Sequence, residues 1–328
     1  KSGELKISLD LDFDENFNLE DYQFDGYVKK IKGDYKKNII FENLDFIFAI
    51  NKNLGSLREI KGLINEISIN SGSLDYNSLE NLEVNMNFES KLNLKNEELN
   101  QLLEKLNVNY PLKSNISLQG KSKHELTFIL DKKLQILSYD YFLNLENSNF
   151  NLNFKDKFIL PFIGESIKNI TLYDTIVKLK LNSKNKNQFL AQGKYNINEK
   201  KIFNSFNISN NFTDKNSKIG AEVEISVPVN IEFLNYFKPK NDISKLNIDL
   251  LLKKKLIQIT NLKYTDKKNI IDLSDFYFIN GQVNRLGKIV VKTQDPKSNK
   301  INNDFTFSKR KKILIEGKHF DARSLLKA

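Results

Sequence analysis

The chain has 328 residues, of which 40% are hydrophobic and 28% charged, and its formal net charge is +10. This hydrophobic content is enough for a folded core and excludes a disordered chain, while no apolar run approaches the ~20 residues of a transmembrane helix. The chain has no Cys, which excludes a disulfide scaffold and a thiolate metal site. Lysine supplies nearly all the positive charge, so the charge does not indicate nucleic-acid recognition, which favours arginine.

Hydrophobic residues alternate with polar ones at the start of the chain. The hydrophobic set is Leu5, Ile7, Leu9, Leu11 and Phe13. Successive side chains of a strand point to opposite faces, so this pattern predicts a strand with one apolar face. Residues 24–35 and 39–50 are predicted as further strands.

Residues 57–69 fit two patterns. Leu57, Ile60 and Ile64 match one face of a helix, but Gly62 and the turn-like Asn70-Ser71-Gly72 after the segment favour a strand. Regular alternation returns in the next strand, at Leu82, Val84, Met86 and Phe88.

A change of period predicts a short helix after residue 96. Leu99, Leu102, Leu103 and Leu106 form one stripe at helical spacing, and Asn96 is a suitable N-cap. Pro111 closes this unit, and strands resume at 116–118 and 126–130.

The stretch from Leu134 to Phe154 alternates in two phases. Leu143 and Leu145 share one phase, and after the polar residues 146–149 the other phase holds Phe150, Leu152 and Phe154. This pattern predicts two half-buried antiparallel strands joined by a turn.

Further strands are predicted at 170–181, 189–197, 202–208 and 219–227. A second helix is predicted over 231–239, with Asn230 as its cap, and a third is predicted to begin at Asp321. The chain therefore reads as a loose repeat of strands and short helices, with sub-units at 1–111, 112–239 and 240–328. We also expect it to be part of a longer chain, with any membrane anchor or export signal outside it.

More than a dozen predicted strands each present an apolar face, and two short helices cannot cover that area. Each exposed Leu, Ile or Phe forfeits roughly 1.5–3 kcal/mol. Three arrangements solve this problem: two sheets packed as a sandwich, a sheet closed into a barrel, or an open trough lined by a ligand with long apolar chains.

The C-terminal passage resembles a known family. Residues 313–326 contain a strand followed by Gly317, Phe320, Asp321, Arg323 and a Leu-Leu pair, which is similar to a passage in the central region of bacterial AsmA-like proteins, nearest the YhdP branch. The strand series at 259–264, 270–278 and 289–293 is similar as well. This resemblance covers the last third of the chain.

The resemblance implies a fold, a location and a function. Members of this group are anchored in the inner membrane, extend across the periplasm as a β-groove, and take part in moving phospholipid toward the outer membrane. The family is not enzymatic, so no catalytic residue and no cofactor is implied.

Other signals favour structural interpretations. The acidic series from Asp10 to Asp21 has a calcium-loop spacing, but Glu15 stands where such a loop needs Gly, so we interpret the series as the polar face of a strand. His124 and His319 lack ligand spacing and are expected to be structural or surface residues. The lysine runs at 253–255 and 309–312 could contact lipid headgroups, but protection of strand ends is the favoured interpretation.

We therefore expect an all-β protein with a few short helices, whose extended, twisted, mostly antiparallel sheet forms an open, loosely repetitive groove. The expected partners are phospholipid and the inner and outer membranes, with no nucleic acid, metal or cofactor. The candidate groove-lining residues are Leu5, Ile7, Leu9, Leu11, Leu82, Val84, Met86, Phe88, Leu143, Leu145, Phe150, Leu152 and Phe154. If Leu145 lines an open groove, Leu145→Asp is expected to block lipid transfer without harming folding. The alternative function is assembly of outer-membrane proteins, as in TamB-like relatives.

Overall fold

The structure is a computed structural model that describes residues 2–35, 39–64, 67–97, 114–160, 162–309 and 312–323. Strands make up 76% of the chain and helix 2%, and 19 of the strands belong to one sheet. Among the described strands, β1 pairs only with β2 and β21 pairs only with β20, so the sheet has two free edges. The expected all-β, mostly antiparallel, open sheet is confirmed.

The strands have the following bounds: β1 Ser2–Phe13, β2 Leu19–Tyr35, β3 Ile39–Asn51, β4 Leu54–Ile64, β5 Ile67–Asn77, β6 Leu82–Leu94, β7 Ser114–Leu130, β8 Ile136–Phe158, β9 Ile167–Asn182, β10 Asn187–Ile197, β11 Asn204–Phe212, β12 Asn216–Ile225, β13 Val229–Ile231, β14 Tyr236–Lys238, β15 Ser244–Lys253, β16 Leu256–Asp266, β17 Asn269–Ile279, β18 Gln282–Arg285, β19 Lys288–Gln294, β20 Ile301–Lys309 and β21 Ile313–His319. A short 3-10 turn, η1, spans Glu232–Leu234.

The chain divides into two compact units, with boundaries that differ from the three expected sub-units. Unit 1 holds residues 1–94, 118–148 and 176–187, and unit 2 holds residues 95–117, 149–175 and 188–328. The threefold repeat with divisions at 111 and 239 stays a prediction.

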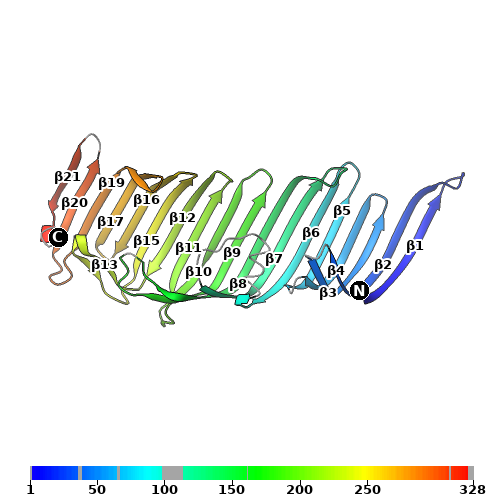
Figure 1. Ribbon diagram of the computed structural model, residues 1–328, viewed down its shortest axis with the longest axis horizontal. Coiled ribbons are helices and arrows are strands. Elements are labelled where there is room, and N and C mark those ends of the chain that lie inside the picture. The colour runs from blue at the N-terminus through cyan, green and yellow to red at the C-terminus, as the bar shows by residue number, and fades with distance from the viewer. Residues whose placement is uncertain are drawn as a thin grey trace. The chain divides into compact units, whose positions relative to one another are not determined.

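Unit 1 is built around an antiparallel meander in which each of β1 to β6 pairs with the next strand (Figure 1). Residues directly opposite each other on paired strands share a face of the sheet. One row of paired residues crosses all seven strands, and its members are Leu9, Phe24, Ile50, Gly55, Tyr76, Val84 and Phe128. The strands of this unit therefore present their hydrophobic residues on one common face, which we call the apolar face of unit 1.

Bulges keep the hydrophobic residues on this face where the alternation changes phase. Lys30 in β2 and Asn43 in β3 have positive φ angles of 53° and 50°, and each lies within a shift of strand register. Such a residue adds one position to its strand, so the next hydrophobic side chain returns to the same face. The change of phase is thus compatible with an uninterrupted strand.

A bulge of the same kind lies in the stretch at 134–154, where a hairpin was expected. This stretch lies in β8, a single strand of 23 residues, and Asn147 within it has a φ of 48°. A side chain placed at Gly120 would contact both Leu145 and Ser148, so these two residues face the same way on either side of Asn147. The expected turn at 146–149 is therefore wrong, and a bulge accounts for the change of phase.

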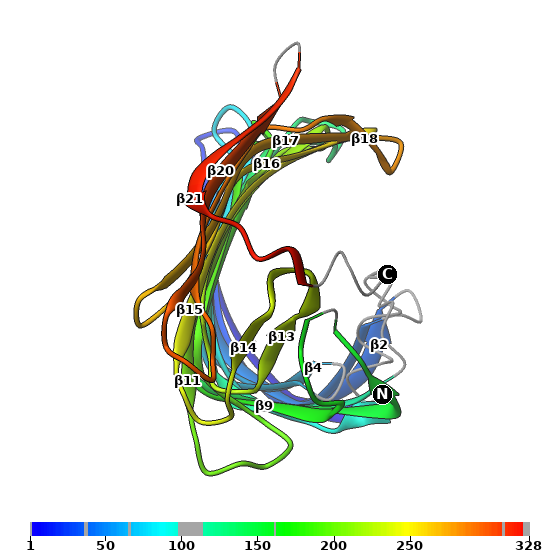
Figure 2. The same cartoon turned by 90° about the vertical axis from the view of Figure 1, so that its left-hand side faces the viewer.

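Unit 2 contains a second antiparallel series, in which β11, β12, β15, β16, β17, β19, β20 and β21 pair in that order, and β18 pairs antiparallel with the C-terminal end of β17. Between β12 and β15 the chain leaves the sheet to form a small hairpin of β13, η1 and β14. Figure 2 shows the strands of this unit curving around the hairpin, which lies on their concave side.

Three other local expectations are settled. Residues 57–64 and 67–69 are strand rather than helix, as expected, but 70–72 continue β5 at a register shift instead of forming a turn. The helix expected at 231–239 is wrong, because those residues form the β13–β14 hairpin with one 3-10 turn. Asn96 and Glu97 are helical, but the rest of that expected helix, and most of the one after Asp321, lie outside the described residues.

Candidate functional site

Eight of the thirteen candidate lining residues lie on the apolar face of unit 1. Leu5, Ile7, Leu9 and Leu11 come from β1, and Leu82, Val84, Met86 and Phe88 come from β6. The row from Leu9 to Val84 places both sets on the same side of the sheet, although β1 and β6 are separated by four strands. A second row runs parallel to it through Ile7, Gly26, Phe48, Leu57, Leu74, Met86 and Leu126.

This face carries no charged side chain on the described, register-paired residues of β1 to β7. Besides hydrophobic residues it holds only Gly, Tyr, Ser and His124. Charged and amide side chains lie on the opposite face, where Asp10 pairs with Gln23 and Asp75 with Asn85. The separation follows from strict alternation between bulges.

The described residues of unit 1 include neither a helix nor a second sheet over its apolar face. On the edge strand, Leu5 is 59% exposed, Ile7 and Leu9 are each 51% exposed, and Leu11 is 40% exposed. Farther into the sheet, Val84 and Met86 are half-buried, and their nearest cover is the paired residues of neighbouring strands. An exposed apolar face of this kind marks an interaction site, whether for a protein, a membrane or an apolar ligand.

A small polar group interrupts this face. The His124 ring stacks on Phe88, with 4.3 Å between ring centroids, and its two nitrogens lie 2.9 Å from the Tyr141 hydroxyl and from Ser122 Oγ. Burial lowers the pKa of His124 from 6.5 to about 4, so the ring is neutral at pH 7. Its place on the apolar face could have been read from the alternation of His124, Leu126 and Phe128.

Leu143 and Leu145 lie on the apolar side of β8, in phase with Tyr141, whose hydroxyl contacts His124. Leu143 is half-buried, but Leu145 is only 5% exposed. Leu145 is therefore buried, and a charge at this position is expected to destabilise the fold. This prediction differs from the expectation that Leu145→Asp leaves folding intact, and a measurement on the variant decides between the two.

Phe150, Leu152 and Phe154 lie in unit 2. Phe154 packs against a core of Ile167, Ile197 and Val227, so at least this residue contacts the protein's own interior. Phe150 and Leu152 are half-buried.

In unit 2 the hairpin packs on the apolar face of the sheet. Val229, Ile231, Leu234 and Tyr236 of the hairpin form one core with sheet residues Tyr264, Ile271 and Val291. These three sheet residues are paired directly across β16, β17 and β19, so they form a continuous row beneath the hairpin. The hairpin therefore covers this row in unit 2, whereas no described segment of unit 1 lies over its apolar face.

The β1–β2 turn accounts for part of the acidic series near the N-terminus. Asp14 accepts hydrogen bonds from the backbone N–H groups of Asn16 and Asn18, and from the Asn18 side chain. These bonds, first among them the one from the Asn18 amide, lower the pKa of Asp14. Within the described ranges, no three His, Cys, Asp or Glu side chains are grouped to hold a metal ion, and no helix there is long and apolar enough to cross a bilayer.

Comparisons with known proteins leave the family open. No family model, no curated protein and no solved structure matches this chain.

Proposed function

We propose that this chain is a segment of an inner-membrane-anchored periplasmic protein, of the AsmA-like kind, that provides a hydrophobic surface for phospholipid transport between the inner and outer membranes. The observation that carries the proposal is the charge-free apolar face of unit 1, which continues across seven paired strands without a described cover in that unit. The proposed role is passive binding and transfer, not catalysis.

The width of the face suits acyl chains. Strands lie ~4.8 Å apart, so β1 to β7 span roughly 29 Å, whereas one leaflet of the hydrocarbon core is only about 15 Å thick, half of a ~30 Å bilayer core. An acyl chain lying across the strands therefore contacts hydrophobic side chains along its whole length. Covering exposed residues such as Leu9 also regains roughly 25 cal/mol per Å² of buried apolar surface.

Movement along such a face needs little energy. Parallel rows of Leu, Ile and Phe side chains offer nearly the same contacts at each position, and no charged residue on the described face has to be desolvated as a chain slides past. The lipid headgroup stays in water, because the sheet covers only one side of the bound chains.

The proposal is tested by photo-crosslinking from two neighbouring residues that face opposite ways. Met86 pairs with Leu74 and Leu126 on the apolar face, whereas Asn87 pairs with Ser73 and Glu125 on the polar face. A photoreactive amino acid at Met86 in cells is expected to capture phospholipid, and the same probe at Asn87 is the control. No lipid at position 86, or equal lipid at both, would contradict the proposal, and capture of a nascent outer-membrane protein strand would favour the assembly function.

A further inference from the structure

The hairpin at 229–238 is fastened to the sheet of unit 2 by side chains alone. In the described residues, its backbone-to-backbone hydrogen bonds run within the hairpin or to the segment at 162–164, where Asn230 N donates to the Phe162 carbonyl and Gly164 N donates to the carbonyl of Pro228, just before the hairpin. It forms a separate two-stranded sheet. Removing it from the face would therefore break no strand pairing of the main sheet.

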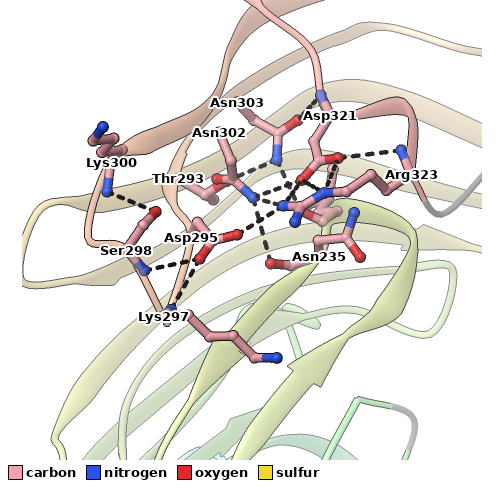
Figure 3. Close-up of polar contacts among 11 residues, drawn as sticks. Asn235, Thr293, Asp295, Lys297, Ser298, Lys300, Asn302, Asn303, Asp321 and Arg323 are labelled. Carbon is pink, nitrogen blue, oxygen red and sulfur yellow. Dashed lines mark hydrogen bonds and ion pairs between the residues drawn. The ribbon is translucent and has the colours of Figure 1, made fainter.

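Two asparagines hold the tip of the hairpin (Figure 3). The Asn303 side-chain amide donates to the Leu234 carbonyl at 2.8 Å, and the Asn302 amide lies 3.3 Å from the same carbonyl and 3.4 Å from that of Asn235. Both asparagines belong to β20, and Asn303 is fully buried. We call Asn302 and Asn303 the latch.

The latch also holds the segment after β21. Asp321 N donates to Asn303 Oδ1 at 3.0 Å, and Arg323 Nη2 lies 2.7 Å from Asp295 Oδ2 while also pairing with Asp321. Arg323 lowers the pKa of Asp295 to about 2, so this ion pair is intact at neutral pH. The hairpin tip, the β19–β20 connection and the segment after β21 therefore meet at one polar network.

The outer side of the hairpin exposes two aromatic side chains beside the polar Asn230 and Glu232. Ile231 and Leu234 face the sheet, but Phe233 and Phe237 are 57% and 45% exposed on the hairpin itself. Phe162, from the neighbouring segment, makes an edge-to-face contact with Phe233, with 6.3 Å between ring centroids. An element with a purely structural role needs only its inner side to be apolar, because exposed aromatic residues gain nothing in water.

We propose that the hairpin at 229–238 is a displaceable cover over the apolar face of unit 2, held closed by Asn302 and Asn303, and that its release opens this face to acyl chains. The nature of the entering chains rests on the proposed function, but the displacement does not. The cover is suited to movement because hairpins of this size are marginal on their own and take their order from what they pack against. Its exposed aromatic side gives acyl chains a surface to contact before the latch releases.

The displacement is tested without lipid, by the reactivity of single cysteines in a chain that has none of its own. Ile271→Cys reports on the face beneath the cover, and Ala191→Cys, at a buried position of β10 outside the hairpin core, reports on unfolding of unit 2. The latch variant is Asn302→Ala with Asn303→Ala, and Lys297→Ala, an exposed change in the β19–β20 connection, is the matched control. Each is labelled with a water-soluble maleimide under native conditions.

We expect the latch variant to raise the labelling rate at position 271 about tenfold or more, since the lost bonds favour the open form, with no change at position 191 or in the Lys297→Ala control. An unchanged rate at 271 would overturn the inference, and so would an equal rise at 191, because release of the hairpin would then be unfolding of the unit. Lipid capture at Met86 is a separate measurement. If the hairpin does not move, the proposed function is unaffected, and if no lipid is captured at Met86, movement of the hairpin does not support that function.

Discussion

The imidazole of His124 stacks on the ring of Phe88, with 4.3 Å between centroids and 10° between the ring planes. The two residues are directly paired across β6 and β7, so the histidine lies among the hydrophobic side chains of the apolar face. Its nitrogens contact two hydroxyls, those of Tyr141 and Ser122, rather than a carboxylate. The surroundings thus favour the neutral ring.

This arrangement predicts that stability falls as the pH is lowered from 6.5 toward 4. The folded-state pKa of His124 is about 4 and its ordinary value is 6.5, so in this window the unfolded chain binds a proton that the folded chain does not. The measurement is urea unfolding at several pH values. His124→Gln removes the titration, and the free energy of unfolding of this variant is expected to depend less steeply on pH by one proton. Identical slopes for the two proteins would contradict the assignment.

The bulge in β8 predicts a position that tolerates glycine but not a β-branched residue. Asn147 has a φ of 48°, which glycine adopts freely and valine does not. Asn147→Gly is expected to change the free energy of unfolding little, whereas Asn147→Val is expected to lower it by about 1–2 kcal/mol. Asn151→Val, at an exposed position of the same strand, is the control, and chemical denaturation is the measurement. Equal effects of the two valines would mean that backbone strain at 147 is unimportant.

The buried hydroxyl of Tyr236 predicts a specific stability loss. It donates to Asp266 Oδ2 at 2.9 Å and contacts the Tyr264 hydroxyl at 3.0 Å, and burial raises its pKa. In Tyr236→Phe, Asp266 Oδ2 keeps only the longer hydrogen bond from the Asn269 amide, at 3.3 Å. A loss of about 1.5–3 kcal/mol is expected, as for other hydrogen bonds to charged groups.

The matched control for Tyr236 is Tyr277→Phe. The Tyr277 hydroxyl accepts from the neutral Gln258 amide at a half-buried site, so its removal is expected to cost less than about 1 kcal/mol. Thermal unfolding of both variants gives the comparison. Equal losses would show that the Asp266 carboxylate does not depend on Tyr236.

Two of the candidate lining residues are expected to respond differently to a charge. Leu145 is 5% exposed and Leu9 is 51% exposed. Leu145→Asp buries an unpaired carboxylate and is expected to destabilise the fold by more than about 3 kcal/mol. Leu9→Asp is expected to leave stability within about 1 kcal/mol of the original while weakening lipid capture at Met86. Circular dichroism melts and the crosslinking yield separate the two effects, and a folded Leu145→Asp protein would contradict the burial of that site.

Much of the fold could be predicted because alternation reports directly on strands. Leu5 to Phe13 and Leu82 to Phe88 alternate without interruption, and both segments are strands whose hydrophobic residues share one face. The break at 146–149 was ambiguous, because a turn and a bulge both reverse the phase of alternation and only the bulge keeps the chain in one strand. Asn147 offers no distinctive signal in the sequence, since asparagine suits both features.

The covering hairpin could not be predicted from spacing. Ile231, Leu234 and Phe237 recur at three-residue intervals, as in a helix, but this interval arises from alternating strand residues on either side of a single 3-10 turn. Which candidate residues remain uncovered also depends on contacts between distant segments, such as the hairpin over Ile271. Alternation identifies the apolar face of each strand but not which segment, if any, packs over that face.

The absence of charge from the described apolar face of unit 1 has a consequence for handling the protein. A sheet with one polar face and one apolar face is amphiphilic. The polypeptide should therefore be surface-active and collect at air–water and oil–water interfaces. Newly made copies of the chain are therefore expected to associate through their apolar faces when they meet in solution.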